Sequence, residues 1–129
     1  MPELKTKVLA VDDIEACLDE VREALQLDAE VTCAPAGKQA LNCIRANVGE
    51  PFKLILLDFH MPEMNGLEVL EEIRTIKGYE KTAVVLLTTA TNPDLMKRAT
   101  QLGAIAWIVK PPSARALKLL VKQVQIDAN

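Results

Sequence analysis

The sequence of 129 residues lacks the features that mark several large classes of protein. No apolar run approaches the roughly 18–20 residues that a membrane-spanning helix needs. Residues 1–7 have no apolar stretch of the kind found in secretory signals. Acidic residues outnumber basic ones, 18 to 15, which argues against nucleic acid as the main partner. We therefore expect a cytoplasmic protein with no DNA partner and no membrane insertion.

Cysteine is also scarce. The three cysteines are Cys17, Cys33 and Cys43, an odd number without C-x-x-C spacing, so the sequence predicts neither a disulfide framework nor a zinc site. We expect them to be small buried thiols in a reducing compartment. Repeats, low-complexity stretches and linkers are missing too, and the length suits one hydrophobic core, so we predict a single domain over residues 1–129.

Short apolar runs alternate with segments of helical periodicity along the whole chain. The predicted strands are residues 7–11, 30–34, 54–58, 83–88 and 106–110. The predicted helices cover about residues 14–25, 37–48, 67–76, 92–102 and 113–124, with apolar residues at three- and four-residue steps. Asn92 and Ser113 are predicted helix caps, and Gly103 a helix end. This order predicts an α/β fold of the flavodoxin-like kind: a doubly wound, five-stranded parallel sheet in order 2-1-3-4-5, with helices on both faces.

Polar side chains stand at the ends of four predicted strands. Asp12 and Asp13 follow the first strand, Asp58 ends the third, Thr88 ends the fourth and Lys110 ends the fifth. In such a sheet the ligand crevice lies beyond the carboxyl ends of the strands, where the strand order reverses. Crowded carboxylates need a compensating cation, and Mg²⁺ prefers oxygen ligands. The residues alone therefore predict a Mg²⁺-dependent phosphoryl site on a carboxylate, with a lysine and a hydroxyl as further phosphoryl ligands.

Each of these residues also has an ordinary structural explanation. Asp12 or Asp13 could cap the first helix, Thr88 could be a common β-branched strand residue, and Lys110 could be a solvated surface charge. Taken one at a time, these explanations are the simpler ones. They do not explain why polar residues stand at four strand ends that meet in one crevice, so we favour the phosphoryl site.

The pattern resembles the receiver domain of two-component response regulators. An acidic pair follows the first strand, residues 58–66 look like the signature D-x-x-M-P-x-x-x-G, Thr88 ends the fourth strand, and Lys110-Pro111 follows the fifth. The resemblance covers essentially the whole chain. Residues 86–111 look most like stand-alone chemotaxis regulators (CheY-like), which commonly carry the pair of threonines and the tryptophan found here.

The resemblance implies a role for each residue of the crevice. Asp58 is expected to be the phosphoacceptor, which takes a phosphoryl group from the phosphohistidine of a sensor histidine kinase. Mg²⁺, or Mn²⁺ in its place, is expected to bind Asp12, Asp13, Asp58 and the backbone carbonyl of His60. The protein is then a signalling switch and not an enzyme, apart from its own phosphorylation and dephosphorylation.

Further residues are implied in the switch itself. Lys110 is expected to pair with the phosphoryl oxygens and Thr88 to turn its hydroxyl toward them. Trp107 stands where the family usually has Tyr or Phe, the aromatic residue whose rotamer follows the threonine. The bond between Lys110 and Pro111 is expected to be cis. Phosphorylation would remodel the face made by the fourth helix, the fifth strand and the fifth helix.

That face is expected to bind the downstream protein target, because no output domain is expected on this chain. Residues 92–129 carry a net charge of +4 and the remaining residues −7, so the face would attract an acidic partner. A merely solvated polar helix face remains the alternative. Chemotaxis signalling to a flagellar motor switch is the leading interpretation, and an intermediate carrier in a multistep phosphorelay is the second.

Three residues depart from the family pattern. His60 lies two residues past Asp58, where its imidazole could alter the lifetime of the phosphoryl group, or where only its backbone carbonyl could count. Thr89 is larger than the small residue that many receivers have there, which could narrow access to Asp58. Pro112 replaces the usual Phe after Lys-Pro, so the packing of this loop on the last helix is an open question.

Three other classes of protein share part of this pattern. A haloacid-dehalogenase-type phosphatase also uses an aspartyl nucleophile and Mg²⁺, but it needs a second Asp where this chain has His60. A flavin-binding flavodoxin needs a phosphate-cradling loop after the first strand, where Asp12 and Asp13 would repel the phosphate. A receiver fold that has lost phosphorylation and acts only as an interaction module is the third alternative.

Overall fold

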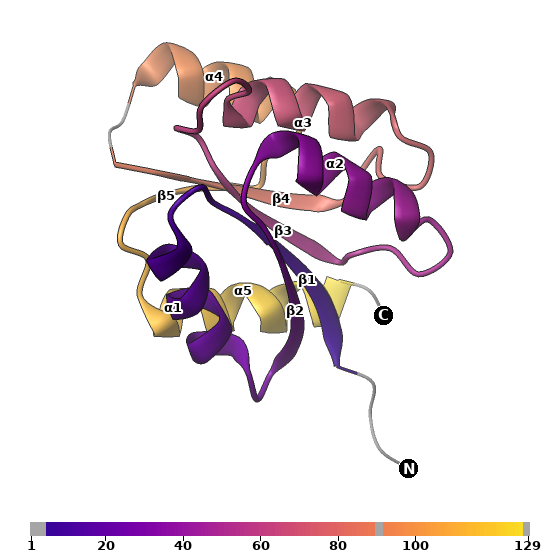
Figure 1. The fold of residues 1–129 in the computed structure, drawn as a ribbon, viewed down its shortest axis with the longest axis vertical. Helices are drawn as coiled ribbons and strands as arrows, with labels where there is room; N and C mark the ends of the chain where they lie inside the picture. Colours follow the sequence, from indigo (N-terminus) through magenta and orange to yellow (C-terminus); the bar gives the residue numbers. More distant parts are fainter. Residues whose placement is uncertain (1–4, 90–91, 128–129) are drawn as a thin grey trace.

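The computed structural model describes residues 5–89 and 92–127 (Figure 1). Its centre is one sheet of five strands in the order β2-β1-β3-β4-β5, and all four neighbouring pairs are parallel. The strands are β1 (Thr6–Val11), β2 (Ala29–Ala34), β3 (Leu54–Asp58), β4 (Ala83–Thr88) and β5 (Ala106–Val109). The predicted fold class and strand order are therefore confirmed.

Five helices alternate with the strands and cover both faces of the sheet. They are α1 (Glu15–Leu25), α2 (Gly37–Ala46), α3 (Gly66–Thr75), α4 (Pro93–Gln101) and α5 (Ala114–Asp127). Figure 1 shows α2, α3 and α4 on one face and α1 with α5 on the other. Among the described residues, no helix is both long and apolar enough to cross a membrane.

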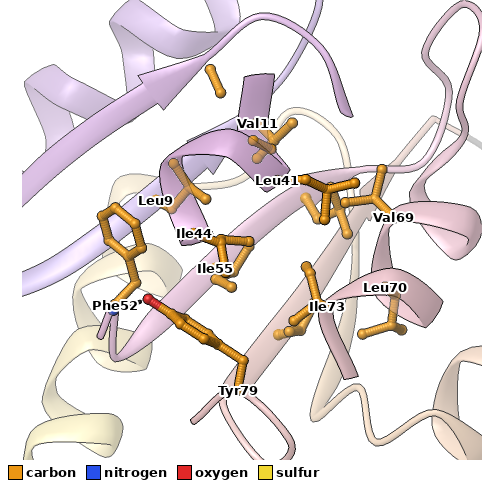
Figure 2. Close-up of a cluster of buried hydrophobic side chains, with 14 of the residues drawn as sticks. Leu9, Val11, Leu41, Ile44, Phe52, Ile55, Val69, Leu70, Ile73 and Tyr79 are labelled. Carbon is orange, nitrogen blue, oxygen red and sulfur yellow. Dashed lines mark hydrogen bonds between the residues drawn. The ribbon is translucent and has the colours of Figure 1, made fainter. Parts of the chain in front are cut away.

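Strand residues alternate between two hydrophobic cores, because successive side chains of a strand point to opposite faces. Leu9, Ile55 and Leu86 belong to the core under α2, α3 and α4, part of which is drawn in Figure 2. Leu56 and Leu87 belong to the core under α1 and α5. Because β1, β3 and β4 are covered on both sides, they read as continuous apolar runs in the sequence.

The predicted helix boundaries have identifiable chemical causes. The Asn92 side chain accepts hydrogen bonds from the backbone N–H groups at the start of α4, and Ser113 does the same for the N–H of Ala116 in α5. Gly103 has a φ of +85° after α4, a conformation that glycine adopts without steric cost. A capping box between Asn65 and Glu68 also starts α3 and was not predicted.

Some sequence-based expectations were wrong in detail. Ile14, the first residue of the helix predicted over residues 14–25, is 52% exposed and stands before α1 as its N-cap. The three cysteines are only partly buried. The helix α2 ends at Ala46, since the side chain of Asn47 bonds the carbonyl of Cys43. The strand β5 ends at Val109, and its residues are partly buried or exposed because it lies at the edge of the sheet.

Two polar residues hold the amino end of the sheet, opposite the strand ends that carry the aspartates. The hydroxyl of Tyr79 donates a hydrogen bond to the carbonyl oxygen of Asn47 at 2.8 Å and accepts one from the N–H of Phe52 at 3.1 Å. Figure 2 shows this phenol at the end of the core beside Phe52. Tyr79 is fully buried, so these two bonds satisfy its hydroxyl without water.

Arg74 forms the second of these anchors, at the end of α3. Its guanidinium donates to four backbone carbonyl oxygens at 2.8–3.1 Å, and these belong to Tyr79, Thr82, Leu102 and Gly103. The four acceptors lie in the turns that lead into β4 and β5. One side chain therefore ties the starts of two strands to α3.

Candidate functional site

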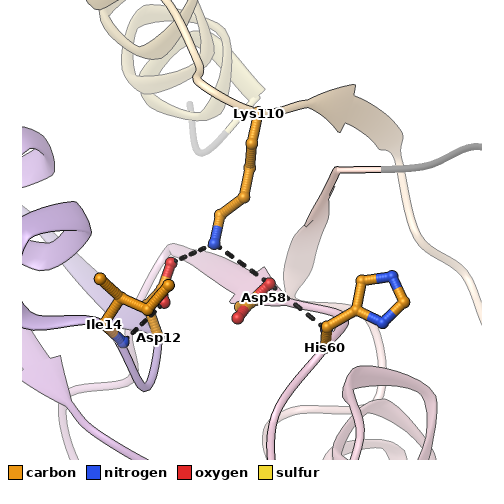
Figure 3. A network of polar contacts seen from close by, with 5 residues as sticks. All are labelled: Asp12, Ile14, Asp58, His60 and Lys110. Atoms are coloured by element: carbon orange, nitrogen blue, oxygen red, sulfur yellow. Dashed lines mark hydrogen bonds and ion pairs between the residues drawn. The ribbon is translucent and has the colours of Figure 1, made fainter.

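Three charged side chains from different strand ends meet at the carboxyl edge of the sheet (Figure 3). Asp12 follows β1, Asp58 ends β3 and Lys110 follows β5. The Nζ atom of Lys110 lies 2.6 Å from Oδ2 of Asp12 and 3.3 Å from Oδ1 of Asp58. Asp12 is only 4% exposed and Asp58 only 2%, and the side chain of Lys110 is 10% exposed, so bulk water screens these charges little.

Backbone groups hold both carboxylates in place. The N–H of Ile14 donates to Oδ1 of Asp12 at 2.9 Å, and the N–H of His60 donates to Oδ1 of Asp58 at 3.3 Å. Each aspartate therefore has one oxygen bonded to the turn that follows its own strand. The cap position of α1 is Ile14, without a side-chain cap hydrogen bond, so Asp12 orders the turn before α1 and does not cap the helix.

The buried charges shift two pKa values. Burial and the negative charge of Asp12 raise the pKa of Asp58 to about 6, although Lys110 and the N–H of His60 oppose the shift. Burial acts to lower the pKa of Lys110, but hydrogen bonds to Asp12 and the charges of both aspartates outweigh it and raise that pKa. At neutral pH the lysine is therefore charged and Asp58 is mostly ionised, in a site that makes its ionisation unfavourable.

The donor set at this edge fits a hard divalent cation. Asp12, Asp13 and Asp58 each offer a carboxylate oxygen, and these atoms lie within 4.8 Å of one another. Asp13 is exposed, so its side chain is open to solvent and to an arriving ion. Oxygen ligands that are few in number, with room for water, are what Mg²⁺ prefers, and Mn²⁺ also accepts oxygen donors.

Thr88 and Lys110 are joined through the backbone. Thr88 is fully buried at the end of β4, and its carbonyl oxygen accepts the N–H of Lys110 at 2.7 Å. The Lys110–Pro111 peptide bond is cis, as the resemblance implies. Thr89 is exposed and lines a cavity beside the site together with Pro112.

Trp107 lies on β5 and packs against the core under α2, α3 and α4. Its ring centroid is 6.0 Å from that of Phe59, the residue after Asp58, and the two rings are tilted by 39°. The indole Nε1 is buried without a hydrogen-bond partner in the described part of the chain. Sequence reasoning missed Phe59, whose ring links the end of β3 to Trp107, because only its place after Asp58 could have suggested the contact.

The backbone of His60, and not its imidazole, contacts the Asp58 carboxylate. The imidazole is exposed and points away from the Asp58 carboxylate in Figure 3. It meets the ring of Phe59 edge-on, with ring centroids 4.7 Å apart. The N–H of the same residue bonds Asp58, so the two parts of His60 face different surroundings.

Residues 8–122 match the family model described as the response regulator receiver domain. The chain belongs to this family. A probable chemotaxis protein CheY of Rhizobium etli is 34% identical over 93% of this chain and 92% of its own length. The structure is similar to that of the chemotaxis protein CheY4 of Vibrio cholerae, with a TM-score of 0.83 and 33% identity over 93% of this chain and 98% of that one.

Receiver domains also occur within larger proteins. A probable cyclic di-GMP phosphodiesterase of Vibrio cholerae is 33% identical over 86% of this chain, but the match spans only 24% of that protein. The present chain is thus a CheY-like receiver domain of two-component signalling. Receiver domains themselves are signalling switches and not classical enzymes, and they interact with histidine kinases and downstream targets.

Proposed function

We propose that this receiver domain is a phosphorylation-dependent switch with Asp58 as its phosphoacceptor. The observation that carries the proposal is the contact of Lys110 with both Asp12 and Asp58 at the carboxyl edge of the sheet. An ammonium group at this place, on a side chain that is only 10% exposed, would offset the charge of a phosphoryl group attached to Asp58. Phosphoryl transfer depends mainly on such positioning and charge neutralisation.

The chemical step needs an ionised Asp58. One carboxylate oxygen attacks the phosphorus of a kinase phosphohistidine, the P–N bond breaks, and the imidazole leaves with the electron pair. The product is an aspartyl phosphate, and no other co-reactant is consumed. Because the pKa of Asp58 is about 6, most of the carboxyl groups are ready for this attack at pH 7.

The acidic cluster supports a divalent cation in the same site. We propose that Asp12, Asp13 and Asp58 bind Mg²⁺, with the backbone carbonyl of His60 as a further ligand and Mn²⁺ as a substitute. The ion, when bound, supplies positive charge beside the phosphoryl oxygens. Lys110 then pairs with those oxygens, and the hydroxyl of Thr88 turns toward them.

The signal is proposed to leave through the face made by α4, β5 and α5. Met96, Val109 and Leu119 are exposed apolar residues on these three elements. The helices α4 and α5 also carry five basic residues: Lys97, Arg98, Arg115, Lys118 and Lys122. Such a surface fits a partner segment that combines acidic residues with an apolar one.

Trp107 connects the site with this face. It lies on β5 and contacts Phe59, so a movement at Thr88 that opened space in this layer would let the indole change its rotamer. The unpartnered Nε1 favours such a change, because a buried N–H without an acceptor is unfavourable. Trp107 fluorescence should therefore report the switch.

The likeness to chemotaxis proteins favours one output. We propose that the chain works in the cytoplasm, as a single receiver domain that signals by binding another protein, and that its target belongs to a chemotaxis system, such as a flagellar motor switch. The similarity over nearly the full length of a CheY protein supports this choice.

The proposal can be tested with purified protein and a small acyl phosphate. Mg²⁺ is titrated first while Trp107 emission is followed; the acyl phosphate is then added, and the intact mass is measured with Asp58→Asn as the control. We expect a Mg²⁺-dependent mass gain of one phosphoryl group that is absent from the variant. A gain of equal size in the variant would assign the phosphoryl group to another residue. No gain with either an acyl phosphate or a phosphorylated histidine kinase would leave an interaction-only receiver.

A further inference from the structure

A cavity of about 260 Å³ lies beside the phosphoryl site, between α1 and residues 110–112. Its walls are mostly apolar and include Leu18, Val21, Leu56, Leu87, Pro111 and Pro112. An apolar cavity of about 150 Å³ is large enough for benzene. This one therefore has room for a phenyl ring with a short side chain.

The polar groups around this cavity are mainly acidic. Asp12 and Glu20 line it with one cation, Lys110, and that ammonium group is shared with Asp58. Cys17 also lines the cavity, and the surrounding charges shift the pKa of its thiol. Burial raises the pKa of its thiol, the charge of Asp12 and, more weakly, that of Glu20 add to the rise, and Lys110 opposes them. The polar rim therefore favours a cation over an anion.

From the apolar walls and the acidic rim, we propose that the cavity binds a small arylalkyl ammonium compound. The aromatic ring occupies the space between α1 and the two prolines, and the ammonium group points to Asp12 and Glu20. The bound ammonium competes with Lys110 for the Asp12 carboxylate. The proposed ligand is not a phosphoryl donor, but its site shares Asp12 and Lys110 with the phosphoryl site.

The test uses three compounds of nearly equal size that differ in charge: phenethylammonium, 2-phenylethanol and phenylacetate. Each is titrated up to about 10 mM into the wild-type protein at pH 7 while backbone amide resonances are followed by NMR. Ile14 is the main reporter, because its N–H donates to Oδ1 of Asp12. We expect phenethylammonium to bind about tenfold more tightly than phenylacetate, with the alcohol between them. Equal affinities, tighter binding of phenylacetate, or no shifts at Ile14 and Cys17 would overturn the proposal.

Two glutamates of α1 provide a matched pair of variants. Glu20 lines the cavity, whereas Glu23 is exposed on the same helix and does not line it. We expect Glu20→Gln to weaken phenethylammonium about threefold without changing the affinity for the alcohol, and Glu23→Gln to change neither. An equal effect of the two variants would overturn the assigned direction of the ammonium group.

The position of the ring is tested by filling the cavity. Cys17→Phe should abolish the resonance shifts caused by both the ammonium compound and the alcohol. Its thermal unfolding is measured in parallel. If this variant does not fold, Cys17→Leu serves the same purpose with a smaller added volume. Undiminished binding to a folded variant would overturn the location of the site.

Discussion

The two ends of the parallel sheet are built from different chemistry. At the carboxyl end, charges face charges: two buried carboxylates share the ammonium group of Lys110. At the amino end, the cations face neutral oxygens. Lys7 donates to the side-chain oxygen of Asn47 and to the carbonyl of Glu50, and Arg74 donates to four backbone carbonyls.

The difference shows where this fold is stabilised and where it is used. Carbonyl oxygens accept the hydrogen bonds of a cationic side chain such as Arg74 without placing a negative charge beside it. The carboxyl end instead keeps Asp58 ionised beside Asp12, an arrangement that raises the pKa of Asp58 and lowers the stability of the fold at neutral pH. The amino end holds the strands in place while the carboxyl end stays reactive. The predictions that follow change one end at a time.

The largest effect is expected from Arg74→Met. The variant leaves four carbonyl oxygens without their donor and should lower the free energy of unfolding by about 3 kcal/mol. Urea unfolding followed by circular dichroism would measure it. Arg45→Met is the control, because Arg45 is exposed and its nearest carboxylate oxygen, on Glu72, is 3.8 Å away. Equal losses in the two variants would refute the anchoring role of Arg74.

Asp58→Asn should instead raise the free energy of unfolding. The pKa of Asp58 is raised by folding, so this carboxyl group favours the fold when protonated and disfavours it as the pH rises through about 6. The variant should therefore be more stable than the wild type by about 1–3 kcal/mol at pH 7, and the gain should vanish near pH 4.

Unfolding curves at several pH values would measure this gain. Asp13→Asn is the matched control, because Asp13 belongs to the same acidic cluster but is exposed. Its effect should stay within about 0.5 kcal/mol. A destabilised Asp58→Asn protein at pH 7 would contradict the proposed difference between the two ends.

A smaller loss is expected from Tyr79→Phe at the amino end. The change keeps the ring but removes the hydroxyl that bonds Asn47 and Phe52. Because the site is fully buried, the free energy of unfolding should fall by about 1–2 kcal/mol. Thermal unfolding would measure it, and the phosphorylation of Asp58 should be unchanged. A variant as stable as the wild type would show that these two hydrogen bonds do not stabilise the amino end.

The smallest effect is expected from His60→Asn. A general acid or base typically contributes about 10²–10⁴-fold to a rate, whereas this imidazole points away from Asp58 (Figure 3). We therefore expect the rate of dephosphorylation to change by much less than that. Loss of the aspartyl phosphate, followed by intact mass, would measure it. A hundredfold change in the rate of dephosphorylation would contradict this expectation and would support the sequence-based hypothesis that the imidazole alters the phosphoryl lifetime.

The strand order and the meeting of the charged residues could be predicted because they follow from local patterns. Apolar runs mark the covered strands, and parallel strands bring their carboxyl ends to one edge. The positions of Asp12, Asp58 and Lys110 at three strand ends then place them together.

The anchors of the amino end could not be predicted in the same way. Tyr79 reaches back 32 residues to Asn47, and Arg74 reaches 28 residues forward to Leu102. Neither contact leaves a periodic signal in the sequence. The pKa of Asp58 could not be predicted from the sequence either, because it depends on burial and on the distances between charges and not on residue type.

The most direct measurement is the titration of Asp58 itself. Carbon-detected NMR of its side-chain carboxyl group, in protein free of divalent cations, would follow the resonance from about pH 3 to pH 8. Our account predicts a midpoint of about 6, because burial and Asp12 oppose ionisation. A midpoint at or below the ordinary value of 3.8 would contradict it. The surroundings of Asp58 would then favour its ionised form, and the two ends of the sheet would not differ as described.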